Sequence, residues 1–254
     1  MSGKLTVIGL GPGSAGQLTP EASDALGAAD LLFGYGPYLD RVPVRAGQQR
    51  RGSDNREELD RAAQALTEAA RGASVAVVSG GDPGVFAMAA AVCEALESGP
   101  TDWRELDLSI LPGVTSMLAV AARVGAPLGH DFCALSLSDN LKPWSVVERR
   151  LQAAATAGFV IALYNPISRA RPWQLDQAFD ILRAHLPAAT PVVFGRAVGR
   201  ADERVRVLEL SSAVGSEADM ATCIIVGSAQ TRVLSRPHRS ALIYTPRSNS
   251  VPGT

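Results

Sequence analysis

The sequence predicts an α/β protein made of two α/β domains, each long enough to bury its own core. Short apolar runs alternate with helical patterns four times within residues 1–112, which is typical of a parallel sheet. A stretch rich in turn-forming residues at 124–129 interrupts the alternation, which then restarts. We therefore expect a mostly parallel sheet in a domain at 1–112, a mixed sheet in a domain at 117–247, and a loose tail at 248–254.

The first domain begins with a β-rich run at 5–8 that ends at Gly9. Thr19 is suited to cap the following helix, and Pro20 fits the first helical position. The nearly continuous apolar run at 74–78 indicates a strand that is buried on both faces of the sheet. The other elements expected in this domain are a strand at 29–33, helices at 55–71 and 84–96, and a strand at 106–111. A helix is expected to follow this domain at 116–124.

In the second domain, few residues separate the last two predicted strands, so no long crossover helix fits between them. This spacing indicates a mixed sheet. The elements expected here are strands at 132–137, 159–164, 191–194, 204–210 and 222–226, and helices at 144–156 and 173–185.

The composition excludes several classes of protein. The 254 residues carry 24 Lys and Arg against 25 Asp and Glu, a balance that argues against a nucleic-acid or anionic-membrane surface. No apolar run approaches the length of a membrane span and no signal peptide is evident, so we expect a soluble, cytoplasmic protein. The three cysteines form no C-x-x-C pair and are expected to be buried, and the three histidines share no ligand spacing, so no metal site is predicted.

Arginine makes up 22 of the 24 basic residues, the exceptions being Lys4 and Lys142. Arginine can hold a carboxylate through two parallel hydrogen bonds, so a ligand with several carboxylates is one interpretation of this bias. A G+C-rich genome, which favours Arg and Ala, produces the same bias and is the favoured interpretation of the composition alone.

The first loop with chemical information, residues 9–13, is rich in glycine and follows the first strand directly. Ligands of open parallel sheets gather at the carboxyl ends of the strands, which makes this loop a candidate binding element. A dinucleotide fingerprint would need glycine at Ser14, and Pro12 has no N–H to offer a pyrophosphate. A tight turn without a ligand is the alternative.

Two further loops follow strand ends, at residues 79–84 and 111–116. In the second loop, adjacent glycines allow close approach to the backbone, and Asp82 could hold a ribose hydroxyl or a cationic centre. In the third loop, Thr115 and Ser116 could contact a ligand or simply cap the next helix. Three such loops at three strand ends predict one shared small-molecule site.

The ordered motifs at 9–13, 80–83, 112–116, 163–165 and 222–227 resemble the tetrapyrrole methylases that use S-adenosylmethionine, and the resemblance covers nearly the whole chain. It implies two α/β domains with the methyl donor in the trough between them, and a homodimer. The cofactor contacts that it implies are Pro12, Gly80, Gly81, Asp82, Val85, Thr115, Ser116, Asn165 and Ala197.

Within this family, the loops at 136–144, 163–169 and 195–200 are most similar to the branch that methylates C17 of precorrin-3B during ring contraction, in cobalamin biosynthesis. Asn165 and Gly84 depart from the Met and Phe common in the relative that acts on uroporphyrinogen. A methylase for another ring carbon or for the cobalt-containing intermediate stays an alternative. A dinucleotide-dependent oxidoreductase and a regulatory ligand-binding module are alternatives from other classes.

Methyl transfer from a sulfonium needs no nucleophilic side chain, but ring contraction benefits from a base and an acid near the migrating centre. Loop position makes Asp139 and Lys142 the candidates, with Tyr164 as a possible proton donor. For Asp139, a helix cap or a local turn is the alternative. Arg169, Arg171, Arg196 and Arg200 are predicted to bind substrate carboxylates, whereas Arg61, Arg71, Arg149 and Arg150 lie on predicted helices and are expected to face solvent.

Overall fold

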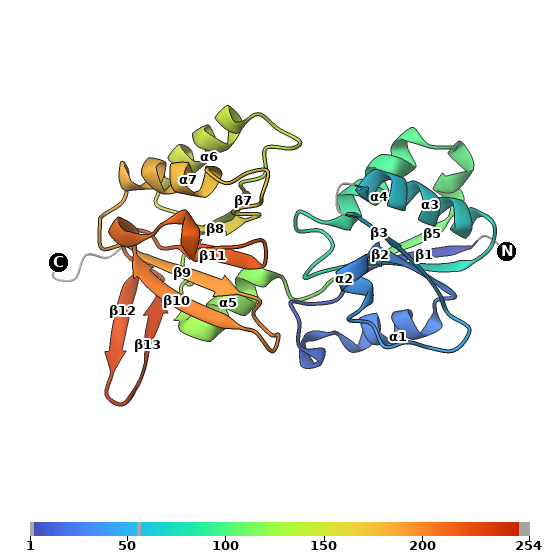
Figure 1. Cartoon of the computed structure of the whole chain (residues 1–254), viewed down its shortest axis with the longest axis horizontal. Coiled ribbons are helices and arrows are strands. Elements are labelled where there is room, and N and C mark those ends of the chain that lie inside the picture. Colours follow the sequence, from blue (N-terminus) through green and yellow to red (C-terminus); the bar gives the residue numbers. More distant parts are fainter. Residues whose placement is uncertain (1–2, 55–56, 249–254) are drawn as a thin grey trace. The chain divides into compact units, whose positions relative to one another are not determined.

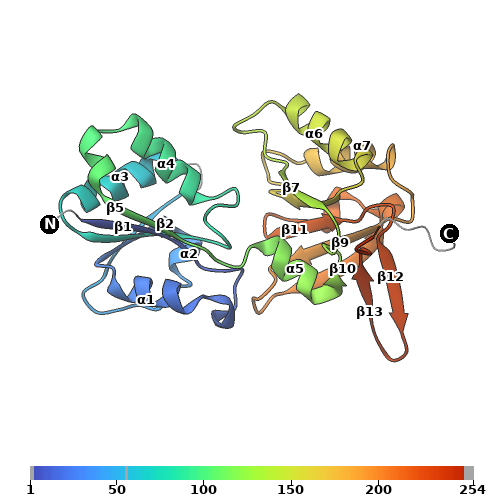
Figure 2. The ribbon, with the colours of Figure 1, turned by 180° about the vertical axis from the view of Figure 1, so that it is seen from behind.

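A computed structural model describes residues 3–54 and 57–248 of the chain. The chain divides into two compact units, Met1–Ser116 and Met117–Thr254, which are described separately below. Each unit is an α/β structure around its own sheet, as Figures 1 and 2 show from two sides, and the predicted fold class is confirmed. The finer domain limits stay a prediction, and the predicted tail beyond Ser248 lies outside the described residues.

The sheet of the first unit has five strands, all parallel, in the order β3-β2-β4-β1-β5. The strands are β1 (Lys4–Gly9), β2 (Leu31–Tyr35), β3 (Gln49–Ser53), β4 (Ser74–Ser79) and β5 (Asp107–Leu111). The helices are α1 (Pro20–Ala28), α2 (Gly36–Leu39), α3 (Glu58–Ala70) and α4 (Met88–Ser98), with short 3-10 turns at Ala15–Gln17 and Thr101–Glu105.

Helices cover both faces of this sheet, with α3 and α4 on one side and α1 on the other (Figure 1). Side chains alternate along each strand, so Val7 and Val77 belong to the core cluster under α3 and α4. Their neighbours Ile8 and Val78 belong to the cluster that contains residues of α1. Burial on both faces explains why the central strands read as continuous apolar runs.

The second unit has a mixed five-stranded sheet in the order β10-β9-β11-β8-β7. Strands β7, β8 and β9 run in the same direction, and β10 and β11 run opposite to them. The strands are β7 (Phe132–Ser136), β8 (Val160–Tyr164), β9 (Pro191–Arg196), β10 (Arg204–Glu209) and β11 (Thr222–Val226). Helices α6 (Trp144–Thr156) and α7 (Gln174–Arg183) lie over one face and α5 (Ser116–Val124) over the other, and short 3-10 turns occupy Leu210–Ser212 and Gly215–Glu217.

A second, three-stranded sheet in this unit joins the hairpin β12 (Arg232–Arg236) and β13 (Arg239–Tyr244) to the short strand β6 (Gly125–Ala126). Both hairpin strands are largely exposed. This hairpin is absent from the sequence-based expectation, although the apolar run at 241–244 in β13 was an available strand signal. The edge strand β3 was missed because its sequence is polar and has no apolar alternation, and the helix α2 because its four residues are too few to show a helical period.

One predicted helix begins later than its sequence pattern indicates. The pattern predicted a helix from 84, but α4 begins at Met88. Phe86 has a φ of 53°, a left-handed conformation that a right-handed helix cannot contain. The segment before Met88 is therefore an ordered loop.

Two expectations about burial were wrong. Arg61 on α3 was expected in solvent, but it is only 3% exposed. Its guanidinium donates hydrogen bonds to Ser53 Oγ at 2.7 Å and to the carbonyl of Asp54 at 2.7 Å, so it holds the end of β3, and burial lowers its pKa. Among the cysteines only Cys223 is buried, which raises its pKa to about 12, whereas Cys93 is exposed.

Candidate active site

The three glycine-rich loops of the first unit meet at one edge of its sheet, because β4, β1 and β5 are parallel neighbours. We call the loops at 9–13, 80–85 and 112–116 together the first-unit edge. Gly11 N donates to Gly81 O at 3.1 Å and Gly81 N donates back to Gly11 O at 2.9 Å. Both glycines have positive φ, 66° and 68°, so a side chain at either would strain this link.

Asp82 fastens the second loop to the third. Its Oδ1 accepts a hydrogen bond from Gly84 N at 2.8 Å, and its Oδ2 accepts one from Gly113 N at 3.0 Å. The structure therefore brings the predicted residues Pro12, Gly80, Gly81, Asp82, Val85, Thr115 and Ser116 onto one edge. It also gives Asp82 a loop-bridging role that the sequence did not indicate.

Two residues after β2 belong to the same edge and were missed by the sequence analysis. Arg41 Nη2 donates to the carbonyls of Leu10 at 3.1 Å and Gly11 at 2.7 Å. The ring of Tyr38 lies so close to Gly80 that an added Cβ there would meet a ring atom at 2.7 Å. Since β2 also ends at this edge, the segment that follows β2 could have been recognised from the sequence as a further candidate binding loop.

In the second unit, the carboxyl ends of β7, β8 and β9 share one edge because these strands run in the same direction. We call the loops that follow them the second-unit edge. The first residue after β8, Asn165, has a φ of 51°, and the first after β9, Ala197, has a φ of 48°. Residues other than glycine rarely adopt this conformation, and such strain clusters at functional sites. Both residues are among the predicted cofactor contacts.

Asn165 is held from both sides. Its Nδ2 donates to Ser136 Oγ at the end of β7 at 3.0 Å, and its carbonyl accepts a hydrogen bond from Arg171 Nη1 at 2.9 Å. Arg171 is only 9% exposed. The arrangement shows that Arg171 supports the Asn165 loop, and its predicted contact with substrate stays a prediction.

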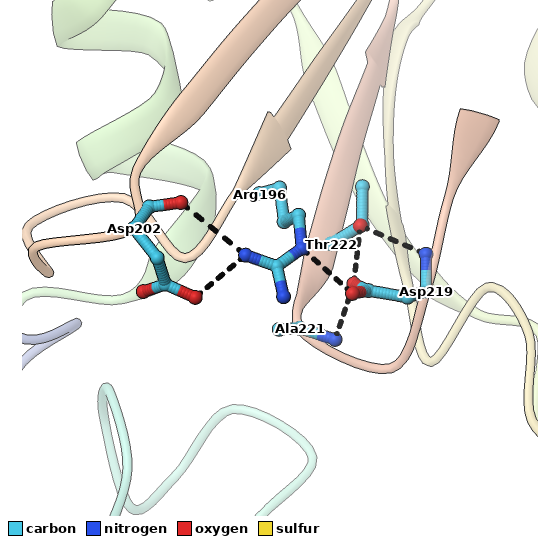
Figure 3. Close-up of polar contacts among 5 residues, drawn as sticks. All are labelled: Arg196, Asp202, Asp219, Ala221 and Thr222. Atoms are coloured by element: carbon cyan, nitrogen blue, oxygen red, sulfur yellow. Dashed lines mark hydrogen bonds and ion pairs between the residues drawn. The ribbon is translucent and has the colours of Figure 1, made fainter.

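Arg196 lies in a network of charged groups, drawn in Figure 3. Its Nε donates to Asp219 Oδ2 at 2.7 Å and its Nη1 to Asp202 Oδ2 at 2.6 Å. The hydrogen bond from Arg196 lowers the pKa of Asp202. Partial burial alone would raise the pKa of Asp219, but hydrogen bonds from Arg196, Thr222 and the Ala221 N–H outweigh it and lower that pKa.

Of the predicted acid–base residues, Asp139 and Lys142 lie on the loop after β7, and Tyr164 is the last residue of β8. Asp139 Oδ2 accepts a hydrogen bond from Gln174 Nε2 at 3.1 Å, and it does not cap α6, whose N-cap is Pro143. Lys142 Nζ donates to Ser138 O at 2.9 Å, and burial lowers its pKa, assisted by nearby Arg150.

The third residue, Tyr164, accepts a hydrogen bond from Met117 N at 3.0 Å through its hydroxyl. Tyr164 therefore contacts the first turn of α5. The acid–base roles of all three residues stay predictions.

Arg169 and Arg200 are exposed on the loops after β8 and β9.

Among the described residues, no group of three or more His, Cys, Asp and Glu side chains is placed to hold a metal ion. No helix in the described part of the chain is long and apolar enough to cross a membrane.

The chain belongs to the tetrapyrrole (corrin/porphyrin) methylase family, whose model matches residues 4–214. It is 64% identical over 247 residues, 97% of both chains, to a precorrin-3B C(17)-methyltransferase from Sinorhizobium sp.. It is similar to the crystal structure of the methyltransferase CobJ, with a TM-score of 0.91 and 48% identity over 96% of this chain and all of that one. It also matches, at 47% identity over 97% of this chain, about half (48%) of the cobalamin biosynthesis protein CobIJ of Mycobacterium tuberculosis.

Proposed function

We propose that this protein is an S-adenosylmethionine-dependent methyltransferase that methylates C17 of precorrin-3B, with ring contraction to precorrin-4, in cobalamin biosynthesis. The observation that carries the proposal is the 64% identity to the Sinorhizobium enzyme over nearly the full length of both chains. The two loop-lined sheet edges are consistent with it, because they are the parts of an α/β fold that bind ligands.

The runner-up is methylation of cobalt-factor III, the cobalt-containing substrate. The chain is 39% identical to the probable cobalt-factor III C(17)-methyltransferase of Salmonella typhimurium, well below its identity to the precorrin-3B enzyme. Both reactions place a methyl group on C17, so the proposed difference lies in the substrate and not in the chemistry.

The first-unit edge carries groups of the kind that a sulfonium cofactor needs. Its adenosine needs close backbone approach and hydrogen-bonding groups, which the first-unit edge supplies through Gly80, Gly81 and the hydroxyls of Thr115 and Ser116. Pro12, Asp82 and Val85 lie on the same edge, and we propose Asn165 and Ala197 as the contacts from the second-unit edge. When bound, S-adenosylmethionine supplies an electrophilic methyl group, and the protein's task is to orient it toward the ring carbon.

For ring contraction we propose Asp139 as the general base, Lys142 as the acid or cation near the oxygen, and Tyr164 as an additional donor. Burial lowers the pKa of Lys142, which is the direction that makes its ammonium group a better proton donor. Arg169 and Arg200 are exposed, so we propose them as contacts for substrate carboxylates. Arg171 and Arg196 were also predicted to bind substrate carboxylates. Both already donate hydrogen bonds to groups of the second unit, Arg171 to Asn165 O and Arg196 to Asp202 and Asp219.

A homodimer is also proposed, on the basis of the family resemblance. Its test is the mass of the purified protein in solution by light scattering. A monomer at the concentrations used for assays would contradict it.

The test of function is to incubate the protein with methyl-labelled S-adenosylmethionine and either precorrin-3B or cobalt-factor III. Label in a ring-contracted product from precorrin-3B is the expected result, and faster transfer to cobalt-factor III would favour the runner-up. Absence of transfer to either substrate would contradict the enzyme assignment.

The acid–base proposal is tested with Asp139→Asn and Lys142→Ala under the same conditions. We expect both variants to transfer the methyl group but to slow contraction by about a hundredfold, the usual scale of general acid–base catalysis. Normal contraction in both variants would exclude these roles.

A further inference from the structure

Arg196 was predicted to bind a carboxylate of the substrate, but its guanidinium already binds two carboxylates of the protein. Asp202 and Asp219 accept hydrogen bonds of 2.6 and 2.7 Å from it, from two different sides (Figure 3). Such charge-assisted bonds are among the strong ones in proteins, so a ligand carboxylate would have to share the guanidinium with both.

The two carboxylates fix the surroundings of Ala197. Asp219 Oδ1 also accepts hydrogen bonds from Ala221 N and Thr222 Oγ1, both at 2.9 Å, at the start of β11. Ala221 in turn accepts a hydrogen bond from Ala197 N at 2.9 Å through its carbonyl. Arg196 is the residue directly before Ala197. Its hydrogen bond to Asp219 therefore links it to the same segment, at Ala221, that accepts the hydrogen bond from Ala197 N.

The other end of the same loop is tied down as well. Arg196 Nη1 reaches Asp202, six residues further on, and Glu203 Oε2 accepts a hydrogen bond from Gly199 N at 2.7 Å. Arg200 N donates to Ala197 O at 3.0 Å and closes the turn. The methyl side chain of Ala197 has no hydrogen-bonding group, so only its surroundings can impose a φ of 48°.

We propose that Arg196 is a positioning residue: with Asp202 and Asp219 it holds Ala197 in the left-handed conformation in which Ala197 contacts S-adenosylmethionine. The inference rests on the proposed function and assigns Arg196 to the cofactor instead of the tetrapyrrole. It also explains why an alanine occupies a position whose backbone conformation favours glycine.

The test measures the dissociation constant of S-adenosylhomocysteine by calorimetry, and the KM for precorrin-3B, in Arg196→Gln. We expect the dissociation constant to rise about tenfold, the scale of the left-handed penalty for an L-residue, while the KM changes little. Arg206→Gln, which removes an ion pair with Glu217 elsewhere in the second unit, is the matched control and should change neither quantity.

A double variant separates positioning from a direct contact. Glycine adopts the left-handed conformation without penalty, so in an Ala197→Gly background the further change Arg196→Gln should weaken S-adenosylhomocysteine binding by less than about threefold. Equal losses in both backgrounds would overturn the inference, as would a raised KM for precorrin-3B with unchanged cofactor affinity. If the wild-type protein did not bind S-adenosylhomocysteine at all, the proposed function would fail and this inference with it.

Discussion

Both sheet edges hold ordered loops at strand ends, but the contacts that order the loops differ between them. On the first-unit edge, loops approach each other through glycine backbone, as in the paired hydrogen bonds between Gly11 and Gly81. On the second-unit edge, side chains hold residues other than glycine in left-handed conformations, as Arg171 does for Asn165. The first arrangement should therefore be sensitive to added atoms, and the second to lost charge.

The largest effect is expected from adding a Cβ where two loops touch on the first-unit edge. In Gly113→Ala the new atom would lie 2.3 Å from Gly81 O and 3.0 Å from Gly9 O, both backbone atoms that cannot move cheaply. We expect a loss of about 1–3 kcal/mol in the free energy of unfolding, measured in urea, and a loss of cofactor binding. Gly36→Ala is the control, since its Cβ would meet nothing within 4 Å, and equal stability of the two variants would contradict the comparison.

A smaller effect is expected from Asp82, whose side chain links the second and third loops of the first-unit edge. Asp82→Asn keeps a single acceptor oxygen, so either Gly84 N or Gly113 N loses its partner. The expected loss is about 1–2 kcal/mol, with weaker S-adenosylhomocysteine binding by calorimetry. The exposed Asp24 on α1 provides the control Asp24→Asn, and the explanation fails if the two variants unfold at the same urea concentration.

Acid should separate the two edges. The pKa values of Asp202 and Glu203 are lowered by hydrogen bonds from Arg196 and Arg123. A carboxyl pKa that is lowered in the folded state means that these contacts stabilise the protein at pH values above the pKa of the unfolded state, near 4. This contribution is lost as the pH falls through the pKa of the folded state.

The measurement is the midpoint of thermal unfolding between pH 7 and pH 3, in the wild-type protein and in Asp202→Asn. We expect the variant to lose less stability on acidification, because it lacks one of the groups that must be protonated. Parallel pH profiles for the two proteins would show that this network does not set the acid response.

The smallest effect is expected from an ion pair outside either edge. Arg206 on β10 pairs with Glu217, and the arginine side chain is 58% exposed. Such surface pairs contribute little, so Arg206→Gln should change the free energy of unfolding by less than about 0.5 kcal/mol. A larger change would mean that charge pairs in the second unit matter in general, and not because they support a loop.

The sequence predicted the buried elements best. The helix at 144–156 and the strand at 222–226 were placed with the observed limits, because apolar periodicity marks elements that face a core. The exposed edge strand β3 carries no such signal. The start of α4 was misplaced because nothing in the local sequence reveals that Phe86 is left-handed.

What the sequence determined by itself is the chemistry on offer: the alternation of strands and helices, three glycine-rich loops at strand ends, and the motifs shared with the tetrapyrrole methylases. Only the tertiary structure decided which polar groups those loops use on each other. Asp82 bridges two loops, Arg61 is buried, and Arg196 binds Asp219 across 23 positions of sequence. These partners come together only when the sheets form, because pairing at a strand end depends on strand order in space and not on distance along the chain.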